Sequence, residues 1–485
     1  MSAALAAPCD RASASAVPPC ASASSVAHPQ LTLAACILGS SVAFIDGSVV
    51  NVALPALALD LGAGPAELTW AVNAYLLPLG ALILLGGGMG DHFGRRRLFL
   101  SGLTLFTLAS VLCAAATSFG WLLAGRGLQG LGAALLMPNS LAILGGAFTG
   151  EARGRAIGTW AAMGALAGAL GPLIGGWLVD AAGWRSIFLL NLPIAGAAGV
   201  LAWRYVAEIR EARQASLDWG GAALATTGLG LATWALTQAS GEKTGISSTV
   251  WIAAAAGAVL LAAFIWLQHR RGDKALMPLS MFATPTFIGL TLLTFFVYGA
   301  LGGLLVLLPF FLIRIEHWSA VAAGAALLPV PIVIGITSRL MGRITANIGG
   351  RLPLAAGAAI VGTGLALYTR VGAGTLNYWT DILPATLVVA LGMGCSAAPL
   401  TTTVMASVDV DRVGAASGFN SAVARIAGLV ATALLGFVFA RQNSTADFVA
   451  GFRLAAMVGA GAAALAAVCA LLLIRTGNTV EKAPA

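Results

Sequence analysis

One aspartate lies deep inside an apolar stretch of the sequence. Asp46 belongs to the segment FIDGSVVNVALP (44–55), within an apolar run that begins near residue 31. A charged side chain near the centre of a bilayer costs roughly 2.5–3.5 kcal/mol on insertion scales, so a carboxyl there tends to hold a proton unless it is paired. Asp46 is therefore a candidate proton carrier. The alternative is a carboxylate that only joins helices by hydrogen bonds and never titrates.

A second charged side chain lies inside another apolar run. Arg126 is part of LLAGRGLQGLGAALLMP (122–138), and Gln129 follows it by nearly one helical turn. An arginine at this depth must pair, snorkel to the headgroups or face water. Beside a transport pathway it could set when a nearby acid releases its proton. Simple snorkelling is the alternative.

Glycine and proline are concentrated in the segment GALAGALGPLIGGWL (164–178). Glycines permit close helix approach, and a proline inside a helix removes a backbone donor and bends the helix. Small-residue packing alone is the simpler interpretation, but the cluster is denser than packing requires. Its members are Gly164, Gly168, Gly171, Pro172, Gly175 and Gly176.

These segments belong to a chain with the composition of a polytopic membrane protein. Of 485 residues, 59% are hydrophobic and only 9% are charged, and apolar runs near the ~20 residues that span a bilayer recur fourteen times without strand-like alternation. Most of the 26 Lys and Arg residues fall in loops on one side, which predicts cytoplasmic termini. Those loop arginines explain the net charge of +8, so no nucleic-acid partner is expected.

No sequence pattern indicates a metal, a cofactor or an enzyme. The six cysteines have no CxxC spacing, the four histidines lie in the tail or at helix ends, and no nucleotide or zinc motif occurs. A transport function would therefore draw its energy from a proton gradient rather than from ATP. Residues 1–28 lack the apolar core of a signal peptide and are expected to form a disordered cytoplasmic tail.

The two halves of the chain resemble each other, which predicts an internal repeat. Gly87, Gly94, Arg96 and Gly102 align with Gly342, Gly349, Arg351 and Gly357, whereas Asp46 and Arg126 align with Ala300 and Val388. The expected fold is therefore an all-α membrane protein of two six-helix bundles plus two inserted helices, an architecture typical of alternating-access transporters. The predicted domains are a tail (1–28), an N-terminal bundle (29–206), an inserted pair with linkers (207–274), a C-terminal bundle (275–475) and a cytoplasmic tail (476–485).

Several motifs together resemble the major facilitator superfamily, and most closely its fourteen-helix drug:proton antiporter family. The matching motifs are DGSVVNVALP (46–55), WxxNAYxL starting at Trp70, GxxxDxxGRR (87–96), RxxQGxGAA (126–134), GPxxGG (171–176), WRxxFxxNxP (184–193) and DW (218–219). The match covers most of the first half of the chain and is weaker in the second. Ser48 replaces the family's usual threonine, and His92 stands where arginine is common.

The resemblance implies roles for particular residues. Asp46 and Arg126 would couple protons, the 164–176 cluster would be the antiporter motif, and Gly87, Asp91, Gly94, Arg95 and Arg96 would form a conformational latch. Candidates for the substrate pathway are Asn51, Asn73, Tyr75, Gln129 and Asn191.

The expected function is proton-coupled export of amphipathic compounds across the cytoplasmic (inner) membrane. The expected partners are a small amphipathic substrate, protons and membrane lipid, and a monomer is the working expectation. No second acid lies mid-membrane in the second half, which disfavours dicationic substrates. A dedicated exporter of one metabolite or natural product is the first alternative, and a membrane sensor or scaffold without transport is the second.

Overall fold

The chain forms long helices that run side by side, as a computed structural model shows. The structure describes residues 28–208, 217–241, 247–272, 275, 277–372, 376–408, 412–439 and 444–475. The two predicted tails lie outside the described residues, apart from His28. In a bilayer, backbone polar groups find no water, so a chain this apolar satisfies them within helices.

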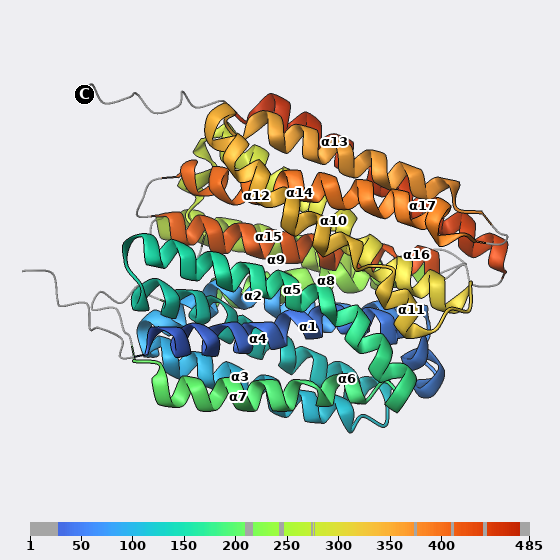
Figure 1. Cartoon of the computed structure of the whole chain (residues 1–485), viewed down its shortest axis with the longest axis horizontal. Helices are drawn as coiled ribbons and strands as arrows, with labels where there is room; N and C mark the ends of the chain where they lie inside the picture. The colour runs from blue at the N-terminus through green and yellow to red at the C-terminus, as the bar shows by residue number, and fades with distance from the viewer. Residues whose placement is uncertain are drawn as a thin grey trace, which may run out of the picture.

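The helices group into two bundles with a pair between them (Figure 1). The first bundle contains α1 (Pro29–Leu61), α2 (Pro65–Phe93), α3 (Arg95–Ala114), α4 (Phe119–Ala147), α5 (Gly150–Ala182), α6 (Ser186–Leu189) and α7 (Asn191–Tyr205). The second contains α10 (Pro285–Arg314), α11 (Ala320–Ala325), α12 (Pro329–Ile348), α13 (Arg351–Leu367), α14 (Leu383–Ala406), α15 (Val413–Leu434), α16 (Gly436–Phe439) and α17 (Thr445–Leu473). Between them in sequence lie α8 (Trp219–Gly241) and α9 (Ser248–Arg271).

Local sequence signals fix where several helices begin and end. Ser118 and Ser444 accept hydrogen bonds from the backbone amides of Trp121 and Asp447, so they cap α4 and α17. Gly62 ends α1 in the left-handed conformation, with φ of 63°. The apolar run 319–340, predicted as one span, corresponds to the candidate membrane span Ala320–Thr345. Within it, a turn at 326–328 separates α11 from α12, which begins at Pro329 because proline is favoured at the first position of a helix.

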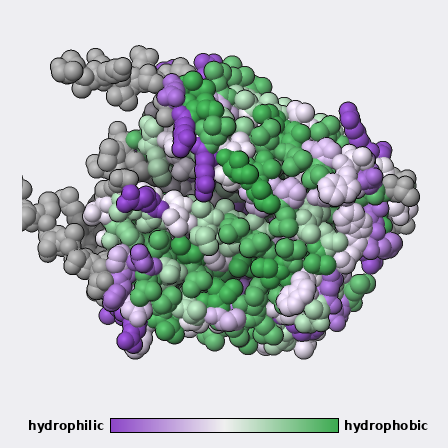
Figure 2. Space-filling view, viewed as in Figure 1, coloured by the Kyte–Doolittle hydropathy of each residue, from purple (hydrophilic) through white to green (hydrophobic). Residues whose placement is uncertain are grey.

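Thirteen helical spans in the described part of the chain are long and apolar enough to cross a membrane. They do not include α8, whose threonine and glycine content lowers its hydropathy, but this helix of 23 residues packs along α9 and against α2 and α15. Figure 2 shows an apolar middle zone with hydrophilic side chains gathered at both ends of the helices. This is the surface expected of a protein embedded in a bilayer.

Candidate functional site

Asp46 and Arg126 form a buried ion pair, although they lie 80 residues apart in the sequence. Asp46 is near the middle of α1, and Arg126 is two turns into α4. Their side chains are 0% and 1% exposed. The snorkelling alternative for Arg126 is therefore wrong, because its guanidinium points into the bundle and not toward the headgroups.

Two neutral side chains donate to the carboxylate, and a third links them to each other. Gln129 and Asn191 donate to Asp46 Oδ1 at 2.9 and 3.0 Å. The same two amides donate to Ser110 Oγ at 2.8 and 3.1 Å, and Ser110 donates to the carbonyl of Phe106. Residues of four helices, α1, α3, α4 and α7, thus form one hydrogen-bonded network around a carboxylate that is 0% exposed.

Arg126 is held in place from three directions. Its Nε donates to the carbonyl of Ala71 on α2 at 3.0 Å, and its Nη1 donates to Gln129 Oε1 at 2.8 Å as well as to Asp46. The Tyr75 ring lies 4.6 Å from the guanidinium carbon, a cation–π contact. These contacts use the planar fork of an arginine, which a lysine does not have.

Not all of the predicted pathway residues belong to this cluster. Tyr75, Gln129 and Asn191 do, and the Tyr75 hydroxyl donates to the carbonyl of Ala43 at 2.9 Å. Asn51 and Asn73 are buried elsewhere, and neither the Asn51 oxygen nor either polar atom of Asn73 has a hydrogen-bond partner. A buried amide without partners is costly, so these two remain candidates for contact with a ligand or water.

The glycines of α5 bring this helix close to α1. A Cβ atom at Gly164, Gly171 or Gly175 would collide with Phe44, Ser48 or Val49 respectively, whereas Gly168 has more room. Pro172 lies inside α5. The packing interpretation is therefore correct for at least these three glycines.

Gly176 and Pro172 instead contact the other bundle. A Cβ atom at Gly176 would meet the backbone of Ala320 and Val321 on α11, and the carbonyl of Pro172 lies against Gly324. Asp180 accepts hydrogen bonds from the amides of Ala320 and Val321 at 3.2 and 2.9 Å. The two bundles are thus joined at the end opposite the arginine-rich loops.

The predicted latch residues have a different set of partners. Arg95 pairs with Asp91 at 2.8 Å and donates to the carbonyl of Ala142. Arg96 donates to the carbonyl of Val206, and its amide donates to Glu208. These partners belong to the N-terminal bundle or to the segment directly after it, so the contacts named here do not cross to the second bundle.

Gly87 and Gly94 provide space at two points of the latch segment. Gly87 faces the ring of Pro138 on α4, and Gly94 adopts φ of 110°, a conformation that favours glycine. Gly94 separates α2 from α3, so the chain turns sharply between Asp91 and the arginines.

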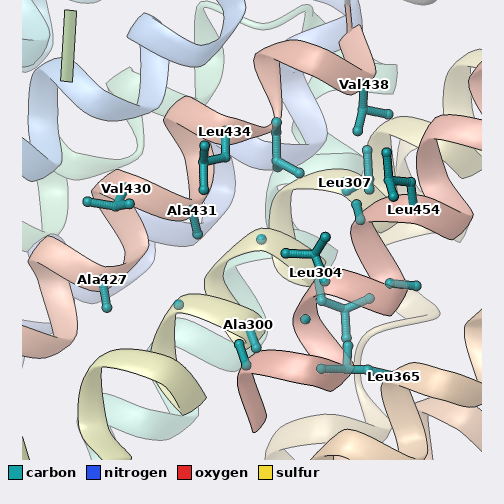
Figure 3. A pocket seen from close by; sticks show the side chains of 18 of the residues that line it. Ala300, Leu304, Leu307, Leu365, Ala427, Val430, Ala431, Leu434, Val438 and Leu454 are labelled. Carbon is teal, nitrogen blue, oxygen red and sulfur yellow. The ribbon is translucent and has the colours of Figure 1, made fainter. Parts of the chain in front are cut away.

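One pocket of the described structure is apolar and lies away from the ion pair. It has a volume of about 480 Å³, lies between α10, α15 and α17, and contains no polar side chain in its lining (Figure 3). Leu304 and Ala431 line its interior, and Val458 at its rim is 60% exposed. It has no group that could carry a proton or bind a charge.

Two contributors to these contacts were not predicted from the sequence. Ser110 is one of four hydroxyl-bearing residues in α3, and no feature of the sequence distinguishes it from the other three. Asp180 lies near a helix end, where acids are common, so its position gave no signal. The proximity of α11 to α5 decides its role.

Comparisons with known proteins agree with this architecture. A family model described as Major Facilitator Superfamily matches residues 36–432. The multidrug resistance protein Stp of Mycobacterium tuberculosis (strain ATCC 25618 / H37Rv) is 34% identical over 421 residues, covering 84% of this chain and 76% of that protein. The methylenomycin A resistance protein of Bacillus subtilis (strain 168) is 32% identical over 443 residues, covering 91% of this chain and 93% of that protein.

A solved structure shares the fold at low sequence identity. It is described as giving structural insights into substrate recognition in proton dependent oligopeptide transporters, and it superimposes with a TM-score of 0.64 at 16% identity. The match covers 92% of this chain and 98% of that chain. At this identity the likeness concerns the fold alone.

Proposed function

The chain belongs to the major facilitator superfamily, and from this premise we propose that it is a proton-coupled antiporter that exports amphipathic drugs or toxic compounds. The observation that carries the proposal is the Asp46–Arg126 pair, a carboxylate held near the middle of the first helix by a network from three other helices. Intramembrane ionisable groups of this kind mark ion and proton pathways. The names of the relatives, a multidrug resistance protein and a methylenomycin A resistance protein, support the export of small molecules.

The described conformation corresponds to one stage of the proposed cycle. The outer ends of the bundles are joined through Asp180 and Gly176, whereas Arg95 and Arg96 make their described contacts within one bundle. In this stage Asp46 is paired with Arg126 and buried. It takes up a proton when the outer side opens and releases it to the cytoplasm when substrate binds, so occupancy by proton and by substrate is mutually exclusive.

The membrane potential and any pH gradient drive this exchange. An inward proton gains about 2.3 kcal/mol per 100 mV, and a pH gradient adds to this. We place the protein in the cytoplasmic membrane with both termini in the cytoplasm, because most loop arginines then face the cytoplasm. No cofactor is needed in this scheme.

Inside-out vesicles test the proton role of Asp46. An imposed pH gradient should drive dye uptake by the unmodified protein, and Asp46→Asn should abolish this accumulation while dye exchange at equal concentration on both sides persists. Asp447→Asn is the matched control, since this exposed acid accepts a hydrogen bond from Ser444, the residue that caps α17, and lies outside the network. Full proton-driven export by Asp46→Asn would mean that the carboxylate only joins helices.

The breadth of the cargo separates the two remaining export hypotheses. Expression in a pump-deficient bacterium should raise resistance to several unrelated lipophilic compounds if the protein is a multidrug exporter. Resistance to one compound would favour a dedicated exporter of a metabolite or natural product. Resistance to none, together with no dye transport in vesicles, would favour a sensor or scaffold.

A further inference from the structure

The second bundle carries a charge that the proton-coupling network does not use. Arg425 lies on α15, twelve residues after the helix begins at Val413. At 1.5 Å per residue this is a depth of about 18 Å, near the middle of a hydrocarbon core of about 30 Å. An arginine this deep is too far from the headgroups to snorkel.

Arg425 points toward the first bundle. Its Nη2 lies 3.2 Å from the sulfur of Met137 on α4, and its Cβ faces Gly80 on α2, where the missing side chain leaves room. Its neighbour Ala422 packs into the apolar core of the first bundle. The guanidinium therefore lies at the interface between the bundles.

This guanidinium lacks a counter-charge. Within the part of the chain that the structure describes, no carboxylate lies within ion-pair distance of Arg425, and its Nε has no hydrogen-bond partner. A thioether is only a weak acceptor. The Asp46 carboxylate is already neutralised by Arg126. One positive charge therefore remains unbalanced at the centre of the interface.

Hydroxyl groups lie between Arg425 and the first turn of α15. Ser417, Ser421 and Arg425 follow one another at intervals of four residues, so they form one stripe along α15. Ser421 is exposed, and α15 is one of the two most amphipathic long helices. A ligand that enters from the cytoplasmic end would meet hydroxyl groups first and the guanidinium last.

We propose that Arg425 binds an anionic group, such as a carboxylate, on the exported amphipathic compound. This inference rests on the proposed export function and specifies its substrate class. A guanidinium pairs with carboxylates through parallel hydrogen bonds, and removal of a charge-assisted hydrogen bond in a shielded site weakens binding strongly. The apolar remainder of the compound would lie against the apolar side chains of the two bundles.

Rhodamine B and its ethyl ester form a matched pair of probes, because they differ only in a free or an esterified carboxylate. In vesicles with an imposed pH gradient, Arg425→Gln should raise the KM for rhodamine B about tenfold or more and change that of the ester less than about twofold. Arg425→Lys should keep the KM for rhodamine B within about threefold of the unmodified value, because it retains the charge. Arg314→Gln, at the exposed outer end of α10, is the matched control and should alter neither dye.

The other possible outcomes would overturn the inference that Arg425 binds an anionic group. Equal losses for both dyes in Arg425→Gln, with normal yield and a monodisperse purified protein, would assign Arg425 to helix packing or conformational change and overturn the inference. Export of the ester but not of rhodamine B by the unmodified protein would overturn it too, while leaving the export function intact. Export of neither dye by the unmodified protein would overturn the inference, and together with resistance to no compound it would overturn the proposed function as well.

Discussion

Asp180 on α5 accepts a hydrogen bond from the backbone amide of Val321 on α11 at 2.9 Å. The two residues belong to different bundles. Asp180 lies near the end of α5 and Val321 near the start of α11, both on the outer side, which is the side opposite the arginine-rich loops. The bond, with its neighbour from Ala320, closes the outer side of the protein in this conformation. The contact ties a side chain of one bundle to the main chain of the other, so it must break whenever the outer side opens.

We therefore expect Asp180→Ala to favour the outward-open state. Asp180 is exposed, so the two hydrogen bonds are worth at most about 1 kcal/mol, and the open fraction should rise about twofold to fivefold. The measurement is the labelling rate of a cysteine placed at Leu173, which packs against Gly324, by a maleimide that cannot cross the membrane. Asp381→Ala is the control, because Asp381 accepts hydrogen bonds only within its own segment. An unchanged labelling rate would mean that the contact does not contribute to closure.

A larger side chain at Gly176 should prevent closure of the outer side. The branched side chain in Gly176→Val would collide with the main chain of Ala320 and Val321, and main chain cannot move aside as a flexible side chain can. We expect dye export to fall about tenfold or more, with the outer face remaining accessible to the maleimide. Gly158→Val is the matched control, since nothing lies within 4 Å of the added atom on the same helix. Similar losses for both variants would point to folding instead of closure.

The sequence predicts the members of the coupling network better than their contacts. Asp46 and Arg126 stand out because each is a charge inside an apolar run, and Asn191 follows from a motif shared with the family. Their side chains come into contact only because α1, α3, α4 and α7 pack together in the folded protein, and local sequence patterns do not predict this packing. Ser110 and Asp180 were missed for the same reason, since each gains its role from a helix distant in sequence.

The sequence predicts the fold in more detail than the contacts of the site, because the length of the apolar runs and the unequal distribution of Lys and Arg between the two sides are strong signals for membrane helices. The sequence predicts α11 and α12 as one span, which the structure confirms, and Pro329 and Pro331 are visible signals for the turn within it. The predicted boundary between the N-terminal bundle and the inserted helix pair stays a prediction, because residues 209–216 of the linker lie outside the part of the chain that the structure describes.

A buried network near the start of α8 should contribute to stability. Gln268 at the end of α9 donates to Asp218 at 2.7 Å and accepts from the amide of Met277 at 2.9 Å. Gln268→Leu leaves that amide and one carboxylate oxygen with fewer partners, at a cost of about 1–3 kcal/mol. We expect a lower thermal unfolding temperature of the detergent-purified protein, and no change for Gln30→Leu at the exposed start of α1. An unaltered unfolding temperature would contradict this role.

The ion pair at the centre of the network can be separated into its structural and its functional contributions. Arg126→Gln alone leaves the buried Asp46 carboxylate without its counter-charge, which should cost about 3–5 kcal/mol of stability. The double variant Asp46→Asn with Arg126→Gln removes both charges, and we expect it to regain most of the lost unfolding temperature. It should nevertheless fail to accumulate dye in response to a pH gradient, because the group that binds the proton is gone. Thermal unfolding and vesicle transport of the same preparations would measure both effects, and proton-driven export by the double variant would contradict the assignment of coupling to this pair.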